Sequence, residues 1–134
     1  MSVLMELQQI IIRETQSDQI IVLREVDGDR QFPIVIGDPE AKAIDRRLKG
    51  LVMPRPMTHD LLASIIEQLG GKLERIEITD LQKRTFFAQL VIKQEGQLIE
   101  IDCRPSDAIA LGIATSVPIY VAEQVLEDVL RNSE

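Results

Sequence analysis

The first 37 residues constrain the fold most, because three strand-like runs follow one another there with only turns between them. The first run alternates apolar and polar residues before it becomes continuously apolar, and the other two are short and apolar. The apolar runs occupy residues 3–12, 20–23 and 32–36. Polar residues and the Asp27-Gly28 pair mark the turns. The pattern predicts a β-meander, and Pro33, which cannot donate a ladder hydrogen bond, places the third strand at an edge or directs its unpaired position outward.

The middle and end of the chain carry helix signals. Apolar spacing predicts a short amphipathic helix with Asp38 as N-cap and Pro39 at its first position, and a stronger helix capped by Thr58. A third helix is predicted from about Ser106 to Ala114. The stronger helix has one apolar stripe, formed by Leu61, Leu62, Ile65, Ile66 and Leu69. A C-terminal helix has one apolar side, formed by Val125, Leu126, Val129 and Leu130.

Further strand signals lie between these helices. Glu95-Gly96 predicts a hairpin turn, and the apolar VPIYV segment predicts a short late strand. The other strands are predicted at residues 73–79, 85–93 and 97–103. Since strands and helices are partly segregated, we predict a single α+β domain over residues 1–134, with short helices packed on a largely antiparallel or mixed sheet.

Composition limits the class of protein. A chain of 134 residues supports one core, and it shows neither a signal-peptide pattern nor an apolar run of the roughly 20 residues that cross a bilayer. Cys103 is the only cysteine, which excludes an internal disulfide and suits a reducing, cytoplasmic setting. The net charge of -7 and the 3% aromatic content mean that any contact with nucleic acid is local, since a basic coat and a stacking platform are both absent.

Three predicted helix starts share an acidic pattern. They are Asp38-Pro39-Glu40, Thr58-His59-Asp60 and Arg104-Pro105-Ser106-Asp107. Acidic side chains in a first turn accept orphan backbone N–H groups and complement the helix dipole, and proline is favoured at the first position. Each motif taken alone is therefore explained by the chemistry of starting a helix.

The same motifs supply the groups of a catalytic site if the fold brings the three helix starts together. Carboxylates bind Mg²⁺ or Mn²⁺, a histidine can take a proton from water, and arginine binds phosphate. The predicted metal ligands are Glu40, Asp102 and Asp107, with Asp60 as a further candidate. The predicted catalytic residues are His59, Asp60 and Asp107, and the predicted phosphate contacts are Arg55 and Arg104. No ligand spacing among them matches a specific metal signature.

Several residues also have structural interpretations. His59, the only histidine, lies near a helix start, where surface or capping histidines are common. The basic residues 46–49 suit the C-terminal end of the first helix and predict a solvated face. Cys103 alternates into the apolar side of its strand and predicts an inert core thiol. Ser106 has a ready role as a cap and lies outside any nucleophile elbow, so a Ser-His-Asp hydrolase is a weaker interpretation.

Four segments of the chain carry motifs that matter together. They are FPIVIGDPEAKAI (32–44), PRPMTHDLL (54–62), TFFAQLVI (85–92) and IDCRPSDAIALGIATSVPIYVAEQVL (101–126). In this order, and without large gaps over about residues 30–126, they resemble the bifunctional nuclease domain family of small bacterial and plant proteins. Each segment is weak alone, and the four together are fairly specific.

The resemblance implies an α+β domain that associates with itself and nuclease activity toward RNA and DNA, as in plant members. It supplies motif positions and no mechanism. The C-terminal excision-repair-type module that some relatives carry is expected to be absent here.

The leading hypothesis is a metal-assisted nuclease that hydrolyses RNA or DNA. The alternative is a non-catalytic oligomeric binding or regulatory module whose polar motifs are structural, and a small-molecule hydrolase or phosphatase is a third interpretation. No membrane partner is expected. A homo-oligomer is predicted, because the meander has edge strands and the terminal helix has an apolar side.

Overall fold

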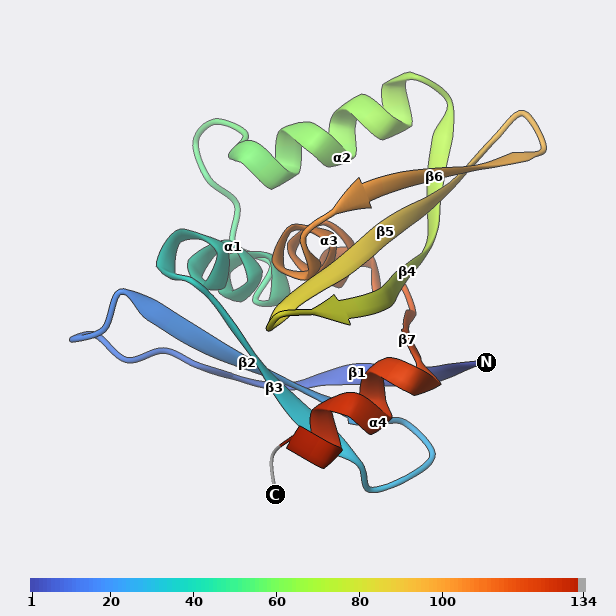
Figure 1. Ribbon diagram of the computed structural model, residues 1–134. Coiled ribbons are helices and arrows are strands. Elements are labelled where there is room, and N and C mark those ends of the chain that lie inside the picture. Colours follow the sequence, from blue (N-terminus) through green and yellow to red (C-terminus); the bar gives the residue numbers. More distant parts are fainter. Residues whose placement is uncertain (133–134) are drawn as a thin grey trace.

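One sheet of seven strands forms the framework of the protein, and the computed structural model describes it over residues 1–132 (Figure 1). The strands are β1 (Ser2–Ile11), β2 (Asp18–Glu25), β3 (Gln31–Gly37), β4 (Gly71–Gln82), β5 (Thr85–Gln94), β6 (Gln97–Cys103) and β7 (Ile119–Ala122). The helices are α1 (Asp38–Leu48), α2 (Thr58–Gln68), α3 (Pro105–Gly112), the 3-10 turn η1 (Ile113–Thr115) and α4 (Glu123–Asn132). The strand order is β3-β2-β1-β7-β4-β5-β6, and the predicted α+β class is confirmed.

The predicted meander occupies one end of the sheet. β1 pairs with β2, and β2 pairs with β3, both antiparallel. β3 has a neighbour on one side only, and Pro33 stands opposite Val22 in that pair. The edge position of β3 agrees with the prediction from Pro33, since an interior strand uses backbone donors on both sides.

A short strand near the end of the chain joins the two halves of the sheet. β7 pairs antiparallel with β1 and parallel with β4, so residues 119–122 lie between strands from the beginning and the middle of the sequence. Ile119 and Val121 are buried there. This parallel pair is what makes the sheet mixed.

The other half of the sheet consists of β4, β5 and β6, which are antiparallel and joined by tight turns. Lys83 and Arg84 in the first turn, and Glu95 and Gly96 in the second, all have positive φ. Positive φ at both central residues is typical of type I′ turns, whose twist matches that of the hairpin. Only the second turn contains the glycine by which the sequence predicts a hairpin.

Helix α3 is the centre of the helical layer. It contacts α1, α2, β4 and β5, and seven of its eight residues are buried. Gly112 at its end lies so close to Ile76 that a Cβ would overlap the Ile76 side chain. α4 contacts β3, β4 and β7, and its apolar side is buried through Val125 and Leu126. No helix within the described residues is both long and apolar enough to cross a membrane.

The first three helices begin one residue earlier than the sequence predicts. Their N-cap residues are Gly37, Met57 and Arg104. The predicted caps Asp38, Thr58 and Ser106 therefore lie within the first turns. Asp38 instead accepts a hydrogen bond from Nε2 of Gln19 at 3.0 Å, and Ser106 is buried.

Helix α2 turns most of its predicted apolar stripe away from the core. Ala63 and Ile66 pack against the core, and His59 is buried beside them in the helix. The exposed members of the stripe are Leu61, Leu62, Ile65 and Leu69. At 3.6 residues per turn these four fall within about 100° of the helix circumference. The helix thus has two adjoining apolar faces, of which the structure buries one.

Candidate functional site

The starts of α1, α2 and α3 converge, as the functional hypothesis requires. α1 and α2 both contact α3. Buried His59, in the first turn of α2, places Nε2 2.9 Å from Oδ1 of Asp107 in the first turn of α3. Because 48 positions separate the two residues, tertiary folding creates this pair.

Arg104 and Glu40 extend the pair into a network of four side chains. The Nε and Nη2 atoms of Arg104 lie 2.9 and 2.8 Å from Oδ2 of Asp107. Nη2 is also 4.0 Å from Oε2 of Glu40. The Arg104 side chain is 66% exposed, whereas those of Asp107 and Glu40 are 29% and 20% exposed. Asp107 therefore contacts His59 through one oxygen and a solvent-exposed guanidinium through the other.

Local backbone structure sets Arg104 and Asp107 side by side. β6 ends at Cys103, and Arg104 is extended, with φ -82° and ψ 147°. Pro105 then begins α3 with a φ that is already helical. Asp107 is the third residue of the helix, where its side chain leans back toward the N-terminus and reaches Arg104.

Gly37 leaves room for the carboxylate of Glu40. A Cβ at Gly37 would overlap Oε1 of Glu40, so this carboxylate folds back against the start of α1. Gln19, which is fully buried, donates from Nε2 to Oδ1 of Asp38 and to the carbonyl of Arg13, each at 3.0 Å. These bonds tie the start of α1 to β2, and negative charge is favourable at that helix end.

A second ion pair anchors the start of α2. Oδ1 of Asp60 binds Nη1 of Arg47, and Oδ2 accepts the backbone N–H of Met57 at 2.9 Å. The Met57 hydrogen bond, followed by Arg47, lowers the pKa of Asp60. Arg47 also donates from Nε and Nη2 to the carbonyls of Ala110 and Leu111. Its side chain is only 14% exposed, so Arg47 joins α1, α2 and the end of α3.

The sequence pattern assigns residues 46–49 to a solvated face, which is wrong for Arg47. A usable signal was present, because Arg47 follows the buried residues Ala43 and Ile44 by four and three positions. That spacing places it on the inward side of α1. Gln19 is also outside the predicted set, and it has no comparable signal, since it is simply the second residue of an ordinary strand.

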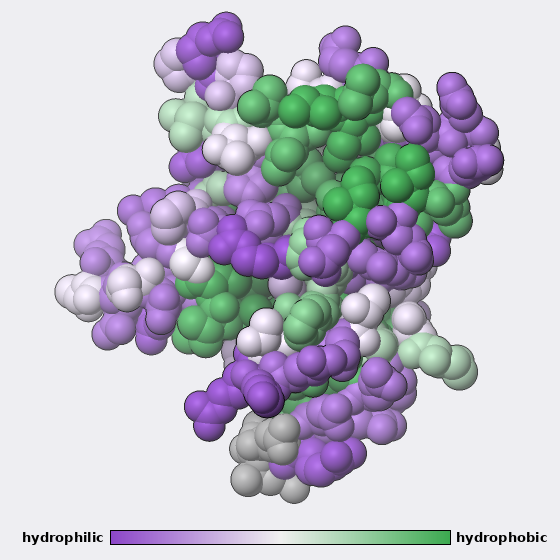
Figure 2. All heavy atoms as spheres, turned by 45° about the horizontal axis from the view of Figure 1, so that its top comes forward, coloured by the Kyte–Doolittle hydropathy of each residue, from purple (hydrophilic) through white to green (hydrophobic). Residues whose placement is uncertain are grey.

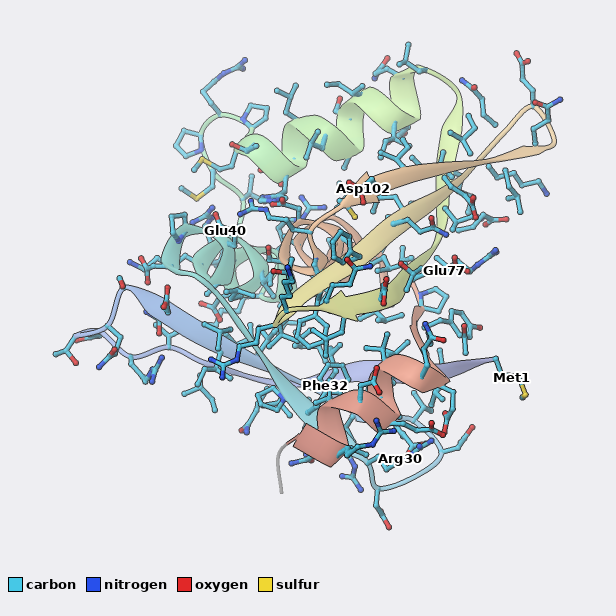
Figure 3. All side chains as sticks on the ribbon, viewed as in Figure 1. Met1, Arg30, Phe32, Glu40, Glu77 and Asp102 are labelled. Atoms are coloured by element: carbon cyan, nitrogen blue, oxygen red, sulfur yellow. The ribbon has the colours of Figure 1, made fainter. Side chains whose placement is uncertain are left out.

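Two predicted site residues stand apart from the network. Asp102 is exposed on β6, opposite Gln89, and Arg55 is exposed in the loop before α2. Neither forms an ion pair with another described residue. Figure 3 shows Asp102 on β6 and Glu40 on α1. Within residues 1–132, no three His, Cys, Asp or Glu side chains are arranged to hold one metal ion. The predicted ligands are thus not gathered into a preformed metal centre.

Cys103 lies directly before the network and packs against the core. Burial, followed by the charges of Asp102 and Asp107, raises its pKa to about 11. Since the thiolate is the reactive form, this thiol is a poor nucleophile.

Two cavities adjoin Arg47. The smaller, of about 10 Å³, is lined in part by His59, Asp60 and Met57 and has room for about one water molecule. The larger, of about 460 Å³, is bordered by α2, β4 and residues 111–118. Every buried side-chain polar atom of the described residues has a partner, so neither cavity contains a buried side chain that awaits a ligand.

The network can orient a histidine for proton transfer. An ionised carboxylate next to Nε2 favours the hydrogen on that nitrogen and leaves Nδ1 as the proton acceptor. Arg104 holds the same carboxylate in place, and its exposed guanidinium has the shape and charge to bind a phosphate group.

Comparison with protein families accounts for most of the chain. A family model for the bifunctional nuclease domain matches residues 21–133, a range that contains the whole network. The chain belongs to the bifunctional nuclease domain family. The resemblance inferred from four sequence segments is confirmed.

Relatives of this bifunctional nuclease domain include bacterial and plant proteins. An uncharacterized protein of Mycobacterium tuberculosis is 43% identical over 117 residues, covering 87% of this chain and 70% of the relative. Bifunctional nuclease 1 of Oryza sativa subsp. japonica is 25% identical over 118 residues, covering 85% of this chain and 36% of the relative. Bifunctional nuclease 1 of Arabidopsis thaliana is 25% identical over 105 residues, covering 75% and 32%. The chain thus spans about a third of the length of these plant relatives.

Proposed function

We propose that this protein is a nuclease that hydrolyses phosphodiester bonds of RNA or DNA at the network of His59, Asp107, Arg104 and Glu40. The observation that carries the proposal is the contact between His59 and Asp107, which joins two of the helix starts in a family whose plant relatives are named as nucleases. An acidic protein binds nucleic acid locally, and an exposed arginine beside a buried histidine is such a local site.

In this proposal the residues of the chain have the following roles. Asp107 accepts the hydrogen of His59 Nε2, and Nδ1 takes a proton from the attacking water. As the P–O ester bond breaks, the leaving oxygen takes a proton from solvent. The small cavity beside His59 offers a place for that water. Arg104 contacts the phosphate, and Arg55 is a second contact from the exposed loop. Asp60 is a positioning residue, because it holds the start of α2 through Arg47.

We further propose Mg²⁺ or Mn²⁺ as the cofactor. The guanidinium of Arg104 lies within 4.0 Å of both Glu40 and Asp107, so the two carboxylates already share a cation. Magnesium is commonly held by one or two carboxylates together with substrate phosphates, where it neutralises developing charge. Glu40 and Asp107 are its candidate ligands, whereas Asp102, the third predicted ligand, stands apart on β6. Arg104 is exposed enough to move from the two carboxylates to the substrate.

The test compares cleavage of labelled single-stranded RNA and DNA by wild type, Asp107→Asn and His59→Ala. General-base catalysis contributes about 10²–10⁴-fold, so each variant is expected to lose at least 100-fold in rate. Asp29→Asn is the matched control, because the Asp29 side chain is fully exposed in the β2–β3 turn, where its ion-pair partner is Arg24 and not a residue of the network. Equal rates for wild type and both site variants would assign the cleavage to a contaminant. Activity that survives a chelator would remove the metal and leave the His59 mechanism.

A second candidate is the non-catalytic binding module. It is favoured by the network itself, in which Asp107 already has a partner on each oxygen and every buried side-chain polar atom of the described chain is satisfied. Under this function, highly purified wild type cleaves nothing, and Asp107→Ala lowers the free energy of unfolding by about 1 kcal/mol or more through lost hydrogen bonds.

A further inference from the structure

The larger of the two cavities has the size and the lining of a small-molecule site. Its volume of about 460 Å³ falls within the range of roughly 300–1,000 Å³ that is usual for ligand pockets. Apolar side chains from several elements line it, namely Ala63 and Ile66 of α2, Leu73 of β4, Leu111 of α3, and Val117. A ligand with an apolar body would therefore remove apolar surface from water here.

The cavity lies on the inner side of α2. Ala63 and Ile66, which border it, pack against the core, whereas the opposite side of the helix is exposed. Figure 2 shows hydrophobic side chains gathered over that exposed side. At Gly71 the first residue of β4 comes close to the helix, because a Cβ there would lie 3.2 Å from the carbonyl oxygen of Ile66. The cavity is thus a space between α2 and β4 beside a point of close contact.

Two carboxylates border the cavity, Glu67 from α2 and Glu74 from β4. Glu74 is skipped in the pairing of β4 with β5, where the register shifts between Leu73 and Arg75. Consecutive residues of a regular strand point to opposite faces, so the bulge is what lets Leu73 and Glu74 both border the cavity. A β-bulge therefore turns a carboxylate toward an apolar space.

The negative charge of the two carboxylates is not balanced by a partner. Neither side chain forms an ion pair or a hydrogen bond within residues 1–132. The C-terminal end of α2 adds to the negative potential, since helix carbonyls carry partial negative charge there and the last turn of α2 contains no basic residue. A cation at this end of the helix would be stabilised by both effects.

The two basic residues at the cavity do not supply that cation. Arg47 is already paired with Asp60 and donates to two backbone carbonyls of α3. Lys72 stands opposite Lys93 in the β4–β5 ladder, and Lys93 follows Ile92, whose side chain packs in the core. Opposite partners share a face of the sheet and neighbours along a strand do not. The ammonium group of Lys72 is therefore directed toward the other face.

We propose that this cavity binds an amphipathic organic cation, a small molecule with an apolar ring or chain and one ammonium group. The apolar body lies against the side chains of α2, α3 and β4, and the ammonium group lies between Glu67 and Glu74. A phosphate ester is the wrong class of ligand, because both carboxylates repel it. The site is therefore separate from the nuclease site proposed around His59, and it does not rest on that proposal.

The test uses two indole probes that differ only in charge, tryptamine and 3-indolepropionate. The chain has no tryptophan, so the fluorescence anisotropy of the probe reports binding directly. Tryptamine is expected to bind about tenfold more tightly than 3-indolepropionate, since only the cation can make charge-assisted hydrogen bonds to the carboxylates. Saturating tryptamine is also expected to slow hydrogen exchange in α2, because the bound molecule contacts α2 and β4 together.

Charge-neutralising variants locate the site. Glu74→Gln and Glu67→Gln are each expected to weaken tryptamine binding about tenfold. Glu14→Gln is the matched control, because it changes the net charge equally and Glu14 is exposed in the β1–β2 turn, outside the cavity. Thr115→Phe, at an exposed position that lines the cavity, keeps the charge and is expected to weaken binding by filling the space. Circular dichroism checks that each variant is folded.

Three results would overturn the proposal. They are the absence of tryptamine binding at millimolar concentration, equal or tighter binding of 3-indolepropionate, and equal weakening by Glu14→Gln and Glu74→Gln, which would assign binding to net charge. The nuclease proposal is tested separately, since Asp107→Asn is expected to abolish cleavage and to leave tryptamine binding unchanged.

Discussion

Helices α2 and α3 each deliver one member of the His59–Asp107 pair, yet they are held in different ways. α3 has seven buried residues among its eight and contacts helices and strands on several sides. α2 has one buried residue, His59, and contacts α3 and β4. Asp107 thus lies on a rigid support, whereas His59 lies on a helix that is held by the packing of Ala63 and Ile66 and by a few polar contacts at its start. Elements with few buried contacts are the first to open locally.

The largest expected effect on stability is the difference between a buried substitution in α3 and an exposed substitution in α2. Ile109→Ala removes a fully buried side chain from α3 and is expected to destabilise the protein by about 2–4 kcal/mol through lost burial and a cavity. Leu62→Ala on α2 shortens a partly exposed side chain and is expected to change stability by less than about 0.5 kcal/mol. Urea unfolding measures both, and equal losses would contradict the contrast between the helices.

A smaller effect is expected at the start of α2. Asp60→Asn breaks the ion pair with Arg47, and the expected loss is up to about 1 kcal/mol at neutral pH, because the side chain is partly exposed and screened. Hydrogen exchange should become faster in α2 and remain slow in α3. Uniform acceleration in both helices would show that they open as one unit.

The pH dependence of the unfolding free energy provides a second measurement for Asp60→Asn. The pKa of Asp60 is lowered in the folded protein, first by the Met57 N–H and then by Arg47. Its ionised form therefore stabilises the fold above about pH 4, and the contribution is lost as pH falls through the lowered pKa. The difference in unfolding free energy between wild type and Asp60→Asn should shrink below pH 4.

A similarly small effect on stability is expected at Gly37. A Cβ there displaces the carboxylate of Glu40, which is the end of a flexible side chain, so Gly37→Ala is expected to change stability by less than about 1 kcal/mol. If Glu40 acts in cleavage, the rate falls several-fold, and the Mg²⁺ concentration needed for half-maximal activity rises. Gly50→Ala is unsuitable as a control because its φ is positive, whereas Gly28→Ala displaces only Glu25. Equal rates for the Gly37 and Gly28 variants would remove Glu40 from the site.

Local patterns account for the parts of the fold that the sequence predicts correctly. Turn residues and alternation are read over a few positions, so the meander, the edge strand with Pro33 and the turn at Glu95-Gly96 are all recognisable. The contact between His59 and Asp107 is different, because capping chemistry alone explains both residues equally well. Only the packing of α2 and α1 on α3 decides that these starts meet.

Tertiary packing also explains what the sequence does not predict. The apolar residues of α2 cover more than half of its circumference, and hydrophobic spacing cannot say which part faces the core. Arg47 illustrates the opposite error, since a long cationic side chain suggests solvent while its position in α1 places it inside. The parallel pairing of β7 with β4 is likewise set by the whole sheet.

The position of β7 has a consequence for the order of folding. Ser2 in β1 pairs with Ala122, and Ile76 in β4 pairs with Ile119, so the two halves of the sheet are joined only through a strand near the end of the chain. Contacts between such distant residues carry a high entropic cost of loop closure and slow the folding of a domain. During synthesis the meander and the β4–β6 hairpins emerge first with their facing edges unpaired. The seven-stranded sheet is completed only when residues 119–122 leave the ribosome.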